Sequence, residues 1–223
     1  MSRALITSAL AWTALGLPLL GLEPAAFGWW SPVWILIVAC TSYLLLAGTA
    51  GLNAARLAAG AAIMAFAVFL AVGSATGWPT GPVRFTEASG PRIAGAFPAL
   101  LPVFIFSILS LCWQTTMALA PSAGRTPASA YSAVMLTFTT LNSISFLAGN
   151  RLWWLWNPWN GNGSPTVLAS ALLCLGLTAF GVAFAFPRDA RLKTSRWCPA
   201  ATVLAAINIL FLASHLIAFR GRP

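Results

Sequence analysis

The segment from residue 76 to residue 95, TGWPTGPVRFTEASGPRIAG, holds the side chains with the greatest capacity for chemistry. Glu87 is one of only three acids in the 223-residue chain, and Arg84 and Arg92 stand on either side of it. A carboxyl group between two guanidinium groups is either a proton-transfer group or one half of a surface ion pair. Because long apolar runs flank the segment, that choice separates an enzyme from a packed bundle of helices.

The composition places the chain in a membrane. Hydrophobic residues make up 59% of it and charged residues 7%, with a mean hydropathy of +0.85, whereas a soluble domain carries roughly 25% charged residues. The net charge is +9, but the basic residues are scattered and form no stripe, which argues against nucleic acid as a partner. Scattered arginines at the ends of apolar runs are typical of contacts with anionic lipid headgroups, so the lipid bilayer is the expected partner.

Seven apolar runs are long enough to cross a hydrocarbon layer about 30 Å thick. They predict an all-α fold, a polytopic transmembrane helix bundle that forms a single domain over residues 1–223, because their length excludes alternating barrel strands. The expected spans are 4–22, 32–52, 54–75, 97–119, 131–149, 166–186 and 198–219. Between the third and fourth spans, residues 76–96 are too long for a simple reversal and rich in turn-forming glycine and proline. We expect an ordered re-entrant or capping loop there.

Lysine and arginine in the short loops predict the orientation. One side of the membrane would hold the N-terminus with seven basic residues: Arg3, Arg56, Arg125, Arg188, Arg191, Lys193 and Arg196. The other side would hold five: Arg84, Arg92, Arg151, Arg220 and Arg222. The expected location is the bacterial inner (cytoplasmic) membrane, with the N-terminus in the cytoplasm. The link between the second and third spans is expected to be a very tight turn around Asn53.

Three stretches of the segment resemble the signature of a known family: Thr76-Gly77-Trp78-Pro79-Thr80-Gly81-Pro82, Phe85-Thr86-Glu87 and Gly90-Pro91-Arg92-Ile93-Ala94-Gly95. This is the integral-membrane carotenoid-biosynthesis family, which includes the carotenoid 1,2-hydratases and the bisanhydrobacterioruberin hydratase. The helix that follows, with Pro98, Pro102 and Trp113, is similar to the family's proline-containing helix. Trp154-Leu155-Trp156 resembles its Trp–x–Trp pair.

The resemblance implies hydration of a terminal C=C bond in an acyclic carotenoid end group. Glu87 would be the catalytic acid that protonates the alkene, and aromatic faces would stabilise the tertiary cation that results. The expected substrate-binding residues are Trp78, Arg84, Phe85, Thr86, Arg92, Trp113, Gln114, Asn142, Trp154 and Trp156. Two polar helix faces, one with Ser107, Ser110 and Gln114 and one with Thr139, Asn142 and Ser143, would hold the water. A carotenoid or another lipid is the expected ligand.

Neither a metal nor another cofactor is expected. Cys40, Cys112, Cys174 and Cys198 fall in or beside four different apolar runs, without a CxxC pair, and His215 is the only histidine. Zinc and iron–sulfur sites need clustered ligands. We therefore interpret the cysteines as small packing residues.

A non-enzymatic function stays open beside the hydratase. Arg84 and Arg92 would favour the ionised form of Glu87, whereas protonation of an alkene needs the neutral acid. Asn142 and Ser143 also stand where the family has an Asp-Pro step, so the sequence offers no second acid to activate water. The alternative is a carotenoid-binding or structural transmembrane subunit of a larger membrane complex, such as a photosynthetic one, with other membrane proteins as partners.

Overall fold

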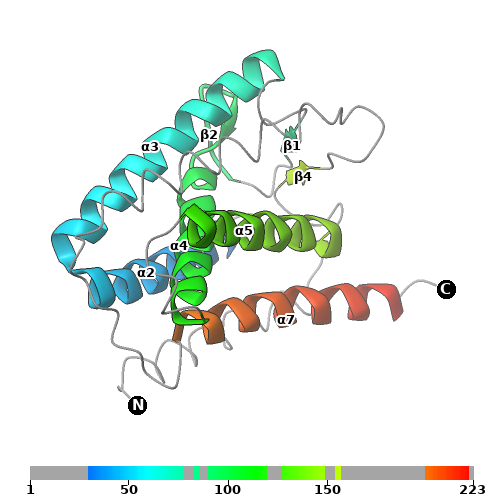
Figure 1. Cartoon of the computed structure of the whole chain (residues 1–223). Helices are drawn as coiled ribbons and strands as arrows, with labels where there is room; N and C mark the ends of the chain where they lie inside the picture. Colours follow the sequence, from blue (N-terminus) through cyan, green and yellow to red (C-terminus); the bar gives the residue numbers. More distant parts are fainter. Residues whose placement is uncertain are drawn as a thin grey trace.

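The structure is a computed structural model that describes residues 30–77, 83–85, 90–119, 127–148, 154–156 and 199–220. This part of the chain is mostly helical, with two small antiparallel sheets at one end (Figure 1). Its helices are α2 Trp30–Ala50, α3 Leu52–Thr76, α4 Leu101–Leu119, α5 Pro127–Ala148 and α7 Pro199–Arg220. Its strands are β1 Val83–Phe85, β2 Arg92–Ile93, β3 Phe97–Pro98 and β4 Trp154–Trp156. The predicted spans 4–22 and 166–186 lie outside the described residues.

The five other predicted spans coincide with helices, and their boundaries differ for local reasons. The α4 helix begins at Leu101, four residues later than predicted, because Phe97–Pro98 belongs to a strand. The α5 helix begins four residues earlier than predicted, at Pro127, and α7 begins at Pro199. Proline suits the first helical position, where its fixed φ is already helical and its missing N–H would have no partner in the helix.

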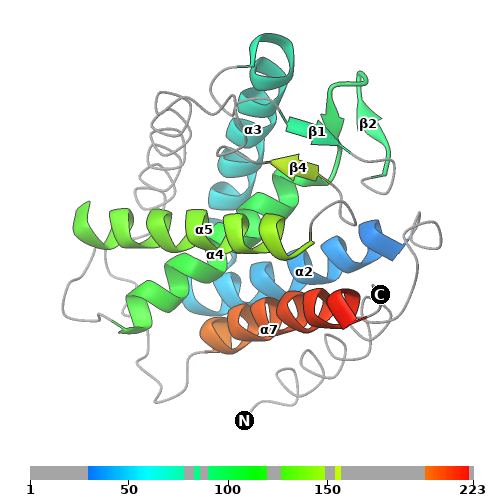
Figure 2. The same cartoon turned by 90° about the vertical axis from the view of Figure 1, so that its right-hand side faces the viewer.

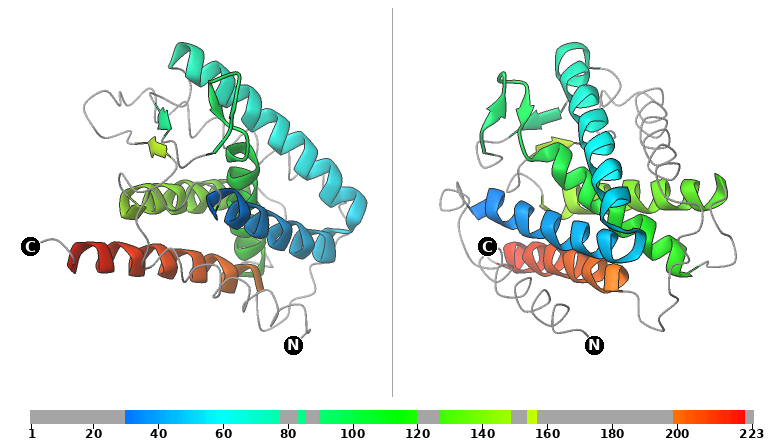
Figure 3. Two further views of the ribbon diagram at one scale, coloured as in Figure 1. Left: turned by 180° about the vertical axis from the view of Figure 1, so that it is seen from behind. Right: turned by 90° about the vertical axis from the view of Figure 1, so that its left-hand side faces the viewer.

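The turn between α2 and α3 consists of a single residue, Gly51, two positions before the expected Asn53, which lies in the first turn of α3. Its backbone angles, φ 89° and ψ 154°, fall in a region that is essentially restricted to glycine. The Gly51 N–H still donates to the Ala47 carbonyl, and the Ala55 N–H donates to the Gly51 carbonyl, both at 3.0 Å. Gly51 therefore breaks the helix sharply while both helix ends keep their hydrogen bonds, and α3 diverges from α2 (Figure 3).

The α4 helix is the centre of the bundle and packs against α2, α3, α5 and α7. It crosses the other helices, while α2, α5 and α7 run roughly alongside one another (Figure 2). Every residue from 101 to 117 is buried except Val103 and Ile105, which are half-buried. A helix that is apolar on all sides is expected in the middle of a bundle.

The polar side chains of α4 are compatible with this burial because their own helix satisfies them. Several hydroxyl groups donate to a carbonyl one turn earlier, a bond that removes the need for a partner on another helix. In α4 these are Ser107 to Val103 at 2.7 Å, Thr115 to Leu111 at 2.8 Å and Thr116 to Cys112 at 2.9 Å. In α5, Thr137 donates to Ala133 in the same way at 2.7 Å.

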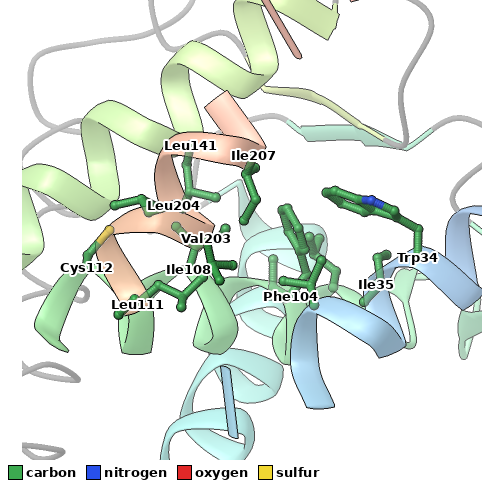
Figure 4. Packing of buried hydrophobic residues seen from close by; sticks show 14 of the residues in the cluster. Trp34, Ile35, Phe104, Ile108, Leu111, Cys112, Leu141, Val203, Leu204 and Ile207 are labelled. Atoms are coloured by element: carbon green, nitrogen blue, oxygen red, sulfur yellow. The ribbon is translucent and has the colours of Figure 1, made fainter. Parts of the chain in front are cut away.

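The core has two hydrophobic clusters, both of which include residues of α4. The first, which we call the aromatic cluster, lies where α2, α4, α5 and α7 meet and includes Trp34, Phe104, Leu141 and Ile207 (Figure 4). The second lies against α3, where the small side chains of Ala55, Ala58 and Ala62 join the same cluster as Trp113, Phe106 and Met117 of α4. Small residues let two helix backbones approach closely, as is common between helices in membranes.

The outer faces of α2 and α3 are apolar and exposed. Leu44 is 68% exposed, Leu57 61%, Met64 65% and Val68 55%. Two segments, Pro32–Ala50 and Leu52–Thr76, are long and apolar enough to cross a membrane. In α4, α5 and α7 the apolar segments found among the residues with described side chains are Leu101–Met117, Tyr131–Leu141 and Pro199–Ile209.

We predict that Gly51→Ala lowers the stability of the protein by about 1–3 kcal/mol, because a side chain is strained in this backbone conformation. Gly60→Ala is the matched control, since Gly60 is inside α3 and an added Cβ would meet nothing within 4 Å. It should leave stability unchanged or raise it by up to about 1 kcal/mol. Thermal unfolding in mild detergent, followed by tryptophan fluorescence, distinguishes the two. Equal melting temperatures for both variants would contradict the assignment of the break to Gly51.

Candidate functional site

Two segments from distant parts of the chain pair at one end of the bundle. Strand β1 is antiparallel to β4, with Val83 opposite Trp156, Arg84 opposite Leu155 and Phe85 opposite Trp154. Residues predicted from the long loop and from the Trp-Leu-Trp stretch therefore meet in one ladder. Only the backbone of Arg84, Trp154 and Trp156 is described, whereas the side chain of Phe85 is described and half-buried.

A short hairpin lies next in sequence and leads into α4. Strands β2 and β3 pair with Arg92 opposite Pro98 and Ile93 opposite Phe97. Their turn has positive φ at two successive residues, Ala94 at 49° and Gly95 at 74°, and the Ala96 N–H donates to the Ile93 carbonyl at 2.9 Å. A turn with this handedness matches the twist of a hairpin. The pair β1–β4 and the hairpin β2–β3 together are called the cap below.

The cap is attached to the bundle at three points. Gly90, with φ 80°, passes so close to the start of α2 that an added Cβ would lie 3.3 Å from Cγ of Pro32. Phe97 is 3% exposed and belongs to the aromatic cluster. Phe85 packs against the same cluster from the end of β1. Both sheets of the cap are thus held by an aromatic side chain that reaches the core.

The aromatic cluster below the cap places several rings near one another. Trp34 and Phe104 are fully buried, and their ring centroids lie 5.9 Å apart at an interplanar angle of 43°. Their side chains are close together between α2 and α4 in Figure 4. Sequence reasoning did not single out Trp34, Phe97 or Phe104 as site residues. Phe97 and Phe104 lie beside the prolines at the start of α4. The rings of Trp34 and Phe104 pack against one another in the core below the cap.

Arg92 connects the two sheets of the cap. Its Nη2 atom donates to the carbonyl oxygen of Phe85 at 3.0 Å, although the residue as a whole is exposed. The bond joins the last residue of β1 to the first residue of β2. No aspartate or glutamate is present among the residues that the structure describes, so any pairing of Arg92 with Glu87 lies outside them, as do Trp78, Thr86 and Glu87 themselves.

Trp113 and Gln114 lie deep in the bundle, away from the cap. Trp113 is 5% exposed within the second cluster, and Nε2 of Gln114 donates to Oγ of Ser110 at 3.2 Å. At 1.5 Å per residue, Trp113 is about 18 Å along the α4 axis from Leu101, where the hairpin ends. Asn142 belongs to the last two turns of α5, and its side chain is not described. Of the predicted residues that the structure describes, Arg84, Phe85, Arg92, Trp154 and Trp156 lie together in the cap, whereas Trp113 and Gln114 do not.

The polar contact between α4 and α5 differs from the expected one. Thr139, which was expected to face the water site, is exposed and donates to the Met135 carbonyl of its own helix at 2.8 Å. The buried hydroxyls of α5 are instead those of Thr137 and Thr140, and both interact with the thiol of Cys112. Periodicity placed the hydroxyl groups on helix faces but did not show which face turns inward. No group of three or more potential metal ligands occurs in the described part of the chain.

Comparison with known proteins adds no further constraint. No protein-family model, no curated protein and no solved structure matches this chain.

We predict that a cysteine pair, Arg84→Cys with Leu155→Cys, forms a disulfide in a background where the four native cysteines are alanine. Directly opposite residues of an antiparallel pair have Cα atoms about 4.5–5.5 Å apart, within the range of about 4.4–6.8 Å that a disulfide needs. The control pair, Arg84→Cys with Trp156→Cys, is shifted by one residue, which turns the second side chain to the opposite face. Non-reducing mass spectrometry of the linked peptides should find the first disulfide in large excess. Equal yields would contradict the register.

Proposed function

We propose that this chain is an integral membrane protein of carotenoid metabolism that hydrates a terminal C=C bond of an acyclic carotenoid. The observation that supports this most is the β1–β4 pairing, because it sets Phe85, the first residue of the Phe85-Thr86-Glu87 stretch, opposite Trp154 of the Trp-Leu-Trp stretch, and both stretches carry the family resemblance. Segments that cooperate in binding one end group have to be close in space. The ring of Phe85 adds support, because it is half-buried at the end of β1 and is the kind of aromatic surface that a polyene end group would contact.

The proposed reaction needs one acid and one water molecule. The carboxyl group of Glu87 transfers its proton to the less substituted alkene carbon, which leaves a tertiary cation on the other carbon. Water adds to the cation, and the proton that it loses returns to the carboxylate, so the enzyme ends in its starting state. Glu87 follows Phe85, the last residue of β1, by two residues in the sequence.

The proposed membrane location rests on two observations: two helices are long enough to cross a bilayer, and apolar side chains of α2 and α3 are exposed. We propose about seven spans in the bacterial inner membrane, with the N-terminus in the cytoplasm. In this arrangement the cap lies on the side opposite the N-terminus. An exposed apolar helix face is stable where lipid covers it.

The proposed topology predicts opposite accessibility for two single cysteines, Arg84→Cys and Arg191→Cys, each in the cysteine-free background. A membrane-impermeant maleimide added to spheroplasts should label residue 84, on the outer side, and should label residue 191 only after the membrane is permeabilised. Total labelling in detergent gives the reference for each variant. Labelling of both residues from the same side would contradict the topology.

The hydratase proposal predicts that Glu87→Gln abolishes product. Glutamine keeps the size and hydrogen bonding of the side chain but has no proton to transfer to carbon, so the rate should fall about 10²–10⁴-fold. Purified protein in liposomes with an acyclic carotene is assayed by mass spectrometry for a product heavier by one water molecule. Glu23→Gln is the matched control, since it removes an acid far from the cap in sequence, and its product should match the wild type. Product from Glu87→Gln at the wild-type rate would refute the role of Glu87.

A second function is favoured by the placement of Arg92. Its guanidinium group is held at the carbonyl of Phe85, close in sequence to Glu87, and a neighbouring positive charge favours a carboxylate over the neutral acid. A carotenoid-binding or structural subunit of a larger membrane complex would not need a neutral acid. Wild-type protein that yields no hydrated product, yet retains a carotenoid or other membrane subunits through purification, would replace the hydratase with this second function.

A further inference from the structure

The cap consists of two sheets that are too small to be stable alone. Strands β1 and β4 have three residues each, and β2 and β3 have two each. An isolated two-stranded sheet is at best marginally stable in water. The position of each sheet must therefore depend on contacts outside it. For β2–β3 this contact is the buried side chain of Phe97, whereas the backbone bond from the Ala99 N–H to the Pro91 carbonyl at 2.9 Å extends the hairpin itself.

The β1 strand has a different support, which comes from the hairpin. The Nη2 atom of Arg92 donates to the Phe85 carbonyl at 3.0 Å, across a separation of seven residues. Since the peptide unit is planar, fixing this carbonyl also fixes the orientation of the peptide bond that leaves β1. The ring of Phe85 also packs against the aromatic cluster. Arg92 thus holds the backbone of Phe85 while the core holds its side chain.

We propose that Arg92 is a positioning residue that acts through Phe85, so that the Phe85 ring is presented to the end group of a carotenoid in a fixed orientation. This inference rests on the proposed carotenoid ligand, but it assigns Arg92 a different task from contact with that ligand. Arginine suits the task because its long side chain reaches back from the hairpin, while its exposed position keeps the charge in contact with water. Without this bond, the contacts of Phe85 that remain among the described residues are those of its ring with the aromatic cluster and of its backbone with β4.

The test is a double-mutant cycle on carotenoid affinity in liposomes, measured by quenching of tryptophan fluorescence with an acyclic carotene. Arg92→Met removes the donor and keeps much of the length, and we expect it to weaken binding about threefold to tenfold, as for one hydrogen bond. In a Phe85→Leu background, Arg92→Met should have no further effect, because the group that Arg92 positions is gone. Arg92→Lys keeps one donor and the charge, and it should recover part of the loss.

Arg56→Met is the matched control, because Arg56 is also an exposed arginine but lies near the start of α3. It should leave affinity unchanged in both backgrounds. Equal effects of Arg92→Met with and without Phe85→Leu would overturn the proposal, since Arg92 would then act independently of Phe85.

A second measurement separates this proposal from the proposed function. Hydrogen–deuterium exchange of the ligand-free protein should show faster exchange in peptides that contain β1 when Arg92 is methionine, with exchange in α4 unchanged. Unchanged exchange in β1 would overturn the positioning role, whatever the ligand is. If Arg92→Met speeds exchange in β1 but the wild-type protein binds no carotenoid, the coupling of Arg92 to Phe85 is supported. The carotenoid ligand and the presentation of Phe85 to it are then both refuted.

Discussion

The nearly complete burial of α4 over residues 101–117 is the constraint on which the rest of the structure depends. A central helix has no solvent face, so each of its polar groups needs a partner inside the bundle. The hydroxyl groups of Ser107, Thr115 and Thr116 meet this need by bonding to carbonyls of the same helix. Their methyl and methylene groups are then available for packing, and four other helices can surround α4. Between α4 and α5, the thiol of Cys112 interacts with the side chains of Thr137 and Thr140.

The cap depends on this central helix because β3 leads into it after two residues. Phe97 occupies the aromatic cluster at the end of α4 and so fixes one strand of the hairpin. The hairpin positions Arg92, Arg92 bonds to Phe85, and Phe85 pairs with Trp154. Each step joins a less stable element to a more stable one, which explains how strands of two or three residues can keep a defined register. A change in the packing of α4 should therefore alter the geometry of the cap before it alters the packing of one helix against another.

Much of the helical part of the structure was predictable, because a long apolar run needs only local information. The exact position of the turn between α2 and α3 was not predictable. Asn53 and Gly51 are both turn-forming residues, and only the backbone angles of Gly51 distinguish them. The β1–β4 pairing was also beyond sequence reasoning, because three-residue strands have too short a pattern to specify a distant partner. The prediction of which face of α5 turns inward was wrong for a related reason. Hydroxyl groups at positions 137, 139 and 140 define two faces, and only the neighbouring helices decide which face is buried.

The separation of the predicted site residues has a consequence for how a carotenoid would bind. In the proposed reaction only the end group of the substrate has to be held, and the ring of Phe85 in the cap is half-buried and thus partly accessible. Trp113 and Gln114 are surrounded by the packed core of the second cluster, so a ligand that reached them would have to displace side chains of α3 and α4. Taking a large buried side chain out of its packing costs several kcal/mol. Under the proposed function, the end group would therefore be recognised at the cap, while Trp113 and Gln114 pack within the bundle.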